Sequence, residues 1–232
     1  MKALPLLSAA CYLLPLICAS ALAQTPVLDP SKGSAIGQQF QAYPSPWQEA
    51  DEESATPANT DPAFKSTTPS MTRDERVKDG HRGDGLIRFS KDLSKAYIDI
   101  KIELGSIPLK NINMFHLHCG VPGILGPILV DFALAEKSIE NVQQDISDDG
   151  ILSVVITDKD IVQNTKSGAG SVAGAFSRGC VIPDLSLGSS APLKVSTVAG
   201  MLALARQGGL YFNLHTTGQT YYGDIRGQLM PK

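Results

Sequence analysis

The stretch AYIDIKIEL, residues 96–104, decides the fold class that we expect for this chain. Its apolar and polar residues alternate, so that one face of an extended chain carries Ala96, Ile98, Ile100 and Ile102 and the other carries Tyr97, Asp99, Lys101 and Glu103. Alternation with a period of two is typical of a half-buried antiparallel strand. The stretch therefore predicts a sheet with one face on an apolar core.

Six further segments have the same character and are bounded mostly by Gly, Pro, Asn or Asp: 85–90, 113–119, 126–134, 150–157, 209–216 and 223–230. Many short strands with turn residues between them predict an all-β fold, an antiparallel β-sandwich with Greek-key-like connections. The exception is STVAGMLALARQGG, residues 196–209, where apolar residues recur at helical spacing behind a Ser or Thr cap. We expect one short helix there.

The N-terminal third differs in composition from the rest. Residues 1–23 have a positive start, an apolar run and an Ala-Leu-Ala cleavage signal, which predict a secretory signal peptide. Residues 24–76 are rich in Pro, Ser, Thr and acidic residues and are expected to form a flexible, disordered leader. Residues 77–232 then form the sandwich domain, with an inserted Gly- and Ser-rich loop at about 160–195.

These features predict a secreted protein, periplasmic or extracellular, with no transmembrane segment in the mature chain. The formal net charge is −3, so the chain lacks the basic field that binding to nucleic acid requires. The partner that we expect for a secreted protein of this kind is another protein or a component of the extracellular matrix.

Export also bears on the cysteines. Cys11 and Cys18 lie in the predicted signal peptide, which leaves Cys119 and Cys180 in the mature chain. Because disulfides persist outside the cytoplasm, we expect these two to form one bridge that holds the inserted loop. The alternative is that a cysteine thiolate ligates a metal beside the histidines.

The candidate site comes from strand parity, since residues two apart share a face of a strand. His116 and His118 therefore point one way from FHLHCG, residues 115–120. The same parity places further polar side chains together on the last two strands, if these pair as a hairpin. By parity the expected polar face consists of His116, His118, Tyr211, Asn213, His215, Asp224 and Arg226, and Thr216, next to His215, is expected to support it.

Two interpretations of this face stay open. In the first, His116, His118 and His215 bind zinc or copper, and Asp224 or Asn213 fixes the imidazole tautomers. In the second, the histidines form a structural polar network with Asp224, Thr216 and backbone groups. Motifs of covalent catalysis are not found, so no catalytic residue is assigned. The fourth histidine, His81, is expected in a solvated loop.

Two segments resemble the chordin-type (CHRD) domain. Phe115 to Phe132, FHLHCGVPGILGPILVDF, resembles its His-x-His strand with the Gly-Pro turn and strand that follow. Gly209 to Leu229, GGLYFNLHTTGQTYYGDIRGQL, resembles its closing strands. The likeness extends over roughly residues 85–229. It implies a secreted, mostly β domain found in chordin, an extracellular binder of growth factors, and in many bacterial proteins without an assigned activity.

The chain departs from that family at three places. Asp224 stands where the family usually has Glu, Cys119 stands where it usually has Gly, and the stretch between Ile156 and Met201 is longer. Growth-factor binding does not carry over, because the cysteine-rich modules of chordin are absent here. The function expected from the sequence is thus an extracellular or envelope binding or structural module. The alternative is a copper- or zinc-binding protein, redox-active in the manner of superoxide dismutase.

Overall fold

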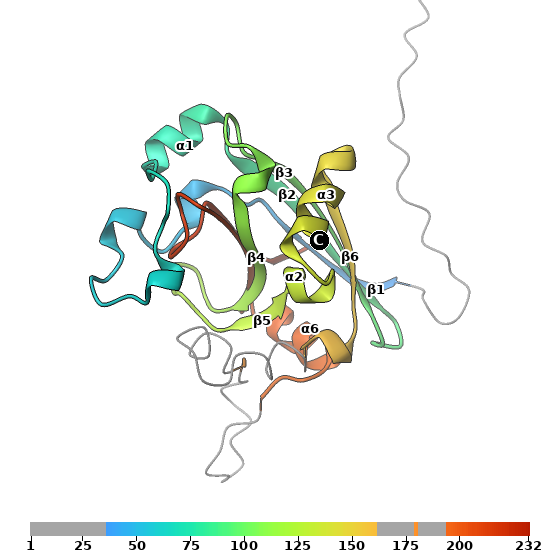
Figure 1. Ribbon diagram of the computed structural model, residues 1–232. Coiled ribbons are helices and arrows are strands. Elements are labelled where there is room, and N and C mark those ends of the chain that lie inside the picture. The colour runs from blue at the N-terminus through green and yellow to red at the C-terminus, as the bar shows by residue number, and fades with distance from the viewer. Residues whose placement is uncertain (1–35, 162–178, 181–193) are drawn as a thin grey trace, which may run out of the picture.

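The computed structural model describes residues 36–161, 179–180 and 194–232, and these form two packed antiparallel sheets with short helices around them (Figure 1). The strands are β1 (Ile36–Ala42), β2 (Arg82–Ser90), β3 (Ala96–Glu103), β4 (Ile112–Cys119), β5 (Ile128–Asp131), β6 (Ile151–Ile156), β7 (Leu210–Thr216), β8 (Ile225–Gln228) and β9 (Met230–Pro231). The α-helices are α1 (Arg73–Asp79), α2 (Phe132–Ala135), α3 (Ile139–Asp149) and α6 (Val198–Arg206), and single 3-10 turns cover Pro46–Gln48, Glu53–Ala55, Pro62–Phe64 and Leu109–Asn111.

The strand order confirms the predicted β-sandwich. One sheet has the order β6-β3-β2-β1-β9 and the other β5-β4-β7-β8. The chain leaves β3, passes through β4 and β5 in the second sheet, and returns as β6 beside β3. Crossings of this kind between two sheets are typical of Greek-key sandwiches. The hairpin expected between the last two long strands is also present, with Asn213 opposite Arg226.

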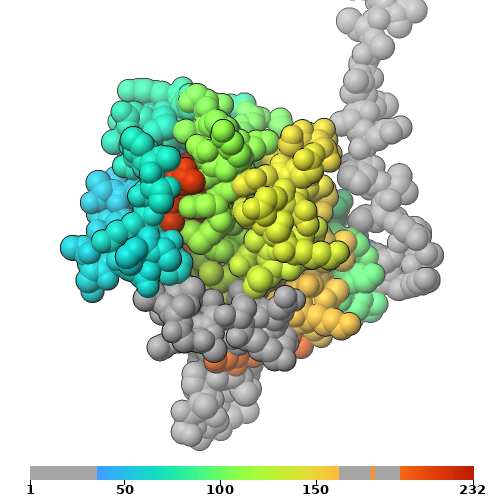
Figure 2. Space-filling view, viewed as in Figure 1, coloured from blue at the N-terminus to red at the C-terminus, as the bar shows by residue number. Residues whose placement is uncertain are grey.

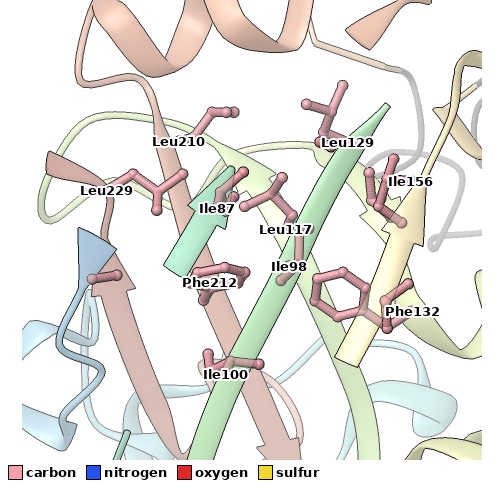
Figure 3. Close-up of a cluster of buried hydrophobic side chains, with 14 of the residues drawn as sticks. Ile87, Ile98, Ile100, Leu117, Leu129, Phe132, Ile156, Leu210, Phe212 and Leu229 are labelled. Carbon is pink, nitrogen blue, oxygen red and sulfur yellow. The ribbon is translucent and has the colours of Figure 1, made fainter. Parts of the chain in front are cut away.

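The core lies between the two sheets and is built by the apolar faces that strand parity predicts. Ile98 and Ile100 of β3 lie opposite Leu117 of β4 and Phe212 of β7 across the core (Figure 3). Phe132 at the start of α2 closes this cluster and packs edge-on against Phe115, with ring centroids 5.0 Å apart. The burial pattern of β3 alternates as its sequence alternates, so AYIDIKIEL does bury its isoleucine face.

The N-terminal boundary of the domain is corrected by the structure. Residues 24–76 are predicted as a flexible leader, but Ile36–Ala42 forms β1, paired with β2 on one side and β9 on the other. The physical reason is a short alternation that buries Phe40 and Ala42 in the core while Gln39 and Gln41 face outward. Residues 1–35, including the predicted signal peptide, lie outside the described residues.

Residues 43–80, which we call the covering segment, pack across the outer face of the smaller sheet. Buried Glu53 accepts hydrogen bonds from the backbone N–H groups of Tyr221 (3.0 Å) and Tyr222 (3.1 Å). The fully buried guanidinium of Arg76 donates to the carbonyl of Gly223 at 2.9 Å. Figure 2 shows this segment, blue to cyan, against the green β4, with a little of the C-terminal chain visible in red between them. As a result, every residue of β7 is buried.

More helices are present than the single one predicted. The expected helix appears as α6, capped by Thr197. In addition, α3 begins at the Ser138 cap, buries Val142 and Ile146, and ends at left-handed Gly150. Helix α1 has a complete capping box between Thr72 and Glu75. Among the described residues, no helix is long and apolar enough to cross a membrane.

The predicted bridge between Cys119 and Cys180 is present, with Cα atoms 5.9 Å apart. Both residues are buried at the end of β4. Most of the inserted loop predicted at about 160–195 lies outside the described residues, but Cys180 is described and is bonded to Cys119 of β4.

The bridge yields a stability prediction. It spans 61 residues of sequence, and chain-entropy arguments give such a loop about 4 kcal/mol of stabilisation. The Cys119→Ser/Cys180→Ser protein should therefore unfold at lower urea concentration than the parent. In the parent, neither Cys119 nor Cys180 should react with thiol reagents before reduction. Reactive thiols at Cys119 and Cys180 in the native protein would contradict the bridge.

Candidate metal centre

Three neighbouring strands present the predicted polar face in register. Strand β4 pairs with β7 so that His116 lies opposite Asn213 and His118 opposite Tyr211. His215 lies opposite Met114 on the same face, diagonal to His116. This outer face is turned away from the core, because Phe115 and Leu117 take the inward positions. The predicted placement of the three histidines on one face is therefore observed.

His116, His118 and His215 lie within contact distance of one another. Their ring centroids are 5.2 Å apart for the first two, 5.4 Å for His116 and His215, and 6.4 Å for His118 and His215. One ring nitrogen from each lies within 4.8 Å of those of the other two. All three residues are about 95% buried. We call them the histidine triad.

Two members of the histidine triad are held by backbone carbonyl groups. Nδ1 of His118 lies 2.9 Å from the carbonyl oxygen of Gly126, and Nδ1 of His215 lies 3.0 Å from that of Thr220. A carbonyl oxygen can only accept, so each Nδ1 must carry the hydrogen. Each Nε2 then has no hydrogen and carries a free lone pair, and neither Nε2 atom has a hydrogen-bond partner among the described residues.

The third member, His116, is oriented differently. Its Nδ1 is the buried nitrogen that has no partner within the described parts of the chain. Its Nε2 lies 4.0 Å from Oδ2 of Asp131, the residue directly opposite it on β5. The histidine triad thus has three buried, unpartnered ring nitrogens: Nδ1 of His116 and Nε2 of His118 and His215.

Gly126 is needed to bring its carbonyl to His118. A Cβ atom at this position would lie 1.6 Å from the carbonyl oxygen of Cys119, so any side chain would push the loop away from β4. The N–H of Gly126 also donates to the Tyr211 hydroxyl at 3.0 Å. The loop after β4 is therefore held on both sides of this residue.

Burial controls the protonation of the histidine triad. It penalises the imidazolium form, lowering the pKa of His118 to about 3 and that of His215 to about 4, and the pKa of His116 well below its usual value. Like-charge repulsion between the rings lowers the pKa of His116 further. At neutral pH the histidine triad is therefore uncharged, which is the form that binds metals.

Aromatic stacking holds one side of the site. The His118 ring stacks on Tyr211, with centroids 5.0 Å apart and planes 8° from parallel. The guanidinium of Arg226 lies 3.5 Å from the centre of the same Tyr211 ring. Since β7 lies between β4 and β8, Tyr211 receives one neighbour from each strand. Arg226 also donates to the carbonyls of Val121 and Ile124, at 2.9 Å each, which fixes the loop that precedes Gly126.

Asp224 does not take the role predicted for it beside the histidine triad. Its Oδ1 lies 2.5 Å from Nδ1 of His81, and its Oδ2 accepts from the Thr216 hydroxyl at 2.8 Å. Asn213 likewise donates to the carbonyl of Tyr222 at 2.9 Å rather than to an imidazole. Neither side chain bonds to His116, His118 or His215 in the described structure.

His81 is buried rather than solvated, which corrects the sequence expectation. It lies between the capped end of α1 and the start of β2, with Asp79 3.1 Å from its Nε2. Burial lowers the pKa of His81, but Asp224 and Asp79 outweigh this and raise it above its ordinary value. The capping box and the Gly80 stop of α1 are visible in the sequence and could have marked this junction. Its partner Asp224, 143 residues away, could not be inferred.

Glu49, in the covering segment, is a second buried group that sequence reasoning missed. It is 4% exposed, and both of its carboxylate oxygens lack hydrogen-bond partners among the described residues. Burial raises its pKa well above the ordinary value, although Arg76 and Arg226 oppose the shift. The polar face and its cover thus bury two groups of polar side chains besides Glu49. One is the histidine triad, and the other is the cluster of Asp224, His81 and Thr216.

Comparison with known families agrees with this architecture. Residues 66–229, more than half of the chain, match the model of the CHRD domain. The chain belongs to the CHRD-domain family. The matched range begins inside the covering segment and leaves out β1, which nevertheless completes the larger sheet of this CHRD domain. Neither the comparison with curated proteins nor that with solved structures gave a match.

The pKa values predict how stability depends on pH in the metal-free protein. His118 and His215 have folded-state pKa values below the unfolded value of about 6.5, so the unfolded state binds more protons between that pH and about 4. Stability should fall as pH decreases through this window, by up to about 1.4 kcal/mol per pH unit for each histidine.

Urea unfolding at pH 7, 6 and 5 measures this slope, and His118→Asn provides the comparison. Asparagine keeps a donor for the Gly126 carbonyl but cannot be protonated. The variant should therefore lose less stability between pH 7 and pH 5 than the parent. Equal losses in the two proteins would contradict a neutral, buried His118.

Asp224→Ala should be among the most destabilising single changes on the polar face. It leaves His81 buried without its closest charged partner, and breaking a buried pair from one side costs about 3–5 kcal/mol. Asp148→Ala removes an exposed carboxylate that accepts a hydrogen bond from Gln144 of its own helix. It serves as the control and should change stability by less than about 0.5 kcal/mol. Similar unfolding midpoints for the two variants would show that the Asp224 pair is dispensable.

Proposed function

We propose that this CHRD domain binds a transition-metal ion, zinc or copper, through His116, His118 and His215. The observation that carries the proposal is a cluster of three buried imidazole rings, each with one nitrogen that has no hydrogen-bond partner among the described residues. One ring nitrogen of each histidine lies within 4.8 Å of those of the other two. A buried polar atom without a partner costs about 1–3 kcal/mol. Three such atoms in one cluster of rings need a common explanation, and a bound cation supplies one.

The alternative, a purely structural polar network, explains the two bonds to backbone carbonyls but not the ring nitrogens without partners. It explains the bonds from His118 and His215 to the carbonyls of Gly126 and Thr220. It also requires partners such as Asp224 and Thr216 for the remaining nitrogens, and these two residues bond to each other instead. The ring nitrogens left without partners among the described residues therefore favour metal binding over the network.

The donor set indicates which metals suit the site. Neutral imidazoles are ligands for zinc and copper, and three of them with an open position form a common zinc arrangement. Metal–nitrogen bonds of about 2.0–2.1 Å place ligand nitrogens about 3.4 Å apart. One ring nitrogen of each histidine lies within 4.8 Å of those of the other two, so ring rotations that bring them closer would complete the site. A bound ion would supply Lewis-acid chemistry or, as copper, electron transfer.

We further infer that the domain works outside the cytoplasm, in the periplasm or the extracellular space. The bridge between Cys119 and Cys180 supports this location, because disulfides persist in oxidising compartments. Membership of the CHRD-domain family and the secretory features of residues 1–23 support it as well. The expected protein or matrix partner and the superoxide-dismutase-like redox activity stay predictions from the sequence.

Metal binding is tested with the mature protein made without a histidine tag. After incubation with Zn²⁺ or Cu²⁺ and gel filtration, metal analysis should give about one ion per chain, and the midpoint of thermal unfolding should rise. His118→Asn and His215→Asn keep a donor for their carbonyl partners but remove the Nε2 ligand. Loss of a residue that only hydrogen-bonds to a metal ligand typically weakens metal binding about 10–100-fold. Loss of a ligand itself, as in each of these variants, should weaken it by a larger factor.

The Cys119→Ser/Cys180→Ser protein is the matched control, because it leaves the histidine triad intact. It should retain metal at the same stoichiometry, which would exclude a thiolate ligand. Parent protein that stays metal-free after incubation, or histidine variants that bind as well as the parent, would overturn the proposed function.

A further inference from the structure

We propose that Asp131 is a positioning residue that holds His116 in the tautomer needed for metal binding, with hydrogen on Nε2 and a lone pair on Nδ1. The inference rests on the proposed function and adds to it a residue that the sequence did not single out. It explains how the one histidine of the triad without a carbonyl partner can be oriented.

The register of the smaller sheet places Asp131 beside His116. The two residues lie directly opposite each other on β5 and β4. Oδ2 of Asp131 lies 4.0 Å from Nε2 of His116, so a small ring rotation would form a hydrogen bond. No backbone carbonyl of the described residues bonds to His116, in contrast to His118 and His215. The carboxylate of Asp131 is thus the acceptor that the structure offers to this ring.

Helix α2 fixes the other half of the same carboxylate. Oδ1 of Asp131 caps the helix, accepting from the N–H groups of Ala133 at 2.9 Å and Leu134 at 3.4 Å. These bonds restrict the rotation of the side chain and leave Oδ2 directed toward His116. Asp131 therefore links the start of α2 to the histidine triad.

The chemistry of the pair determines the tautomer. A carboxylate only accepts hydrogen bonds, so Asp131 selects the form of His116 that donates from Nε2. Nδ1 then has no hydrogen and can bind a cation, as the Nε2 atoms of the other two histidines can. Carboxylate groups placed behind metal-binding imidazoles act in this way, and their loss typically costs about 10–100-fold in metal affinity.

The substitution Asp131→Asn tests this arrangement without removing the helix cap, because Asn caps helices as well as Asp does. In the variant, Oδ1 can still accept from Ala133 and Leu134, and the amide nitrogen then faces His116. An amide N–H donates, so Nε2 of His116 becomes an acceptor and the hydrogen moves to Nδ1. The variant should keep its fold but have one nitrogen of the site blocked by hydrogen.

The first measurement is made on metal-free protein. Nitrogen-15 NMR of the imidazole rings at pH 7.5 reports which ring nitrogen of His116 carries hydrogen. The parent should show the Nε2–H form and Asp131→Asn the Nδ1–H form, while His118 and His215 keep Nδ1–H in both proteins. An unchanged His116 tautomer in the variant would overturn the role of Asp131, whether or not the protein binds metal.

The second measurement is zinc affinity by competition with a chelating dye. Asp131→Asn should bind about 10–100-fold more weakly than the parent, with an unchanged urea midpoint. Asp149→Asn, at an exposed carboxylate that also accepts a backbone N–H, should match the parent in both respects. Parent and Asp131→Asn proteins that bind zinc equally would overturn the inference and leave the proposed function intact. A parent that binds no zinc would overturn the proposed function, while the tautomer measurement still decides the role of Asp131.

Discussion

The structure depends on the burial of both faces of the smaller sheet. One face packs on the apolar core through residues such as Leu117 and Phe212, and the covering segment lies across the other. Water cannot reach most polar atoms on that outer face, so each one needs a partner within the protein or carries a free-energy cost. This constraint explains why so many loops and helix ends converge on strands β4, β7 and β8.

The constraint is met in two different ways on the same face. Around Asp224, the carboxylate, His81 and the Thr216 hydroxyl satisfy one another, and Arg76 binds the neighbouring backbone carbonyl. In the histidine triad, carbonyl oxygens accept from Nδ1 of His118 and of His215, and one nitrogen of each ring has no partner among the described residues. The two clusters therefore differ in chemistry: the first is a network of charged groups that holds the covering segment, and the second is a set of neutral donors suited to a cation.

Much of the sandwich could be predicted from local pattern. Alternation in residues 96–104 and in the strands that carry the histidines correctly predicted which side chains face the core. The short connection after His215 correctly predicted that β7 pairs with β8. The covering segment could not be predicted, because its composition resembles that of a linker. Its order comes from contacts with residues far along the chain, such as Glu53 with Tyr221. For the same reason the partners of His81 and His116 were missed: sheet register, not sequence spacing, brings Asp131 to His116.

The central claim is that three imidazoles of this face bind one metal ion. X-ray absorption spectroscopy of the zinc-loaded, untagged protein tests it most directly, because the scattering from imidazole rings identifies and counts them. The account predicts three imidazole nitrogens at about 2.0–2.1 Å from the metal, with one fewer in His118→Asn. A shell of oxygen ligands alone, or an imidazole count that is the same in the parent and the variant, would contradict it.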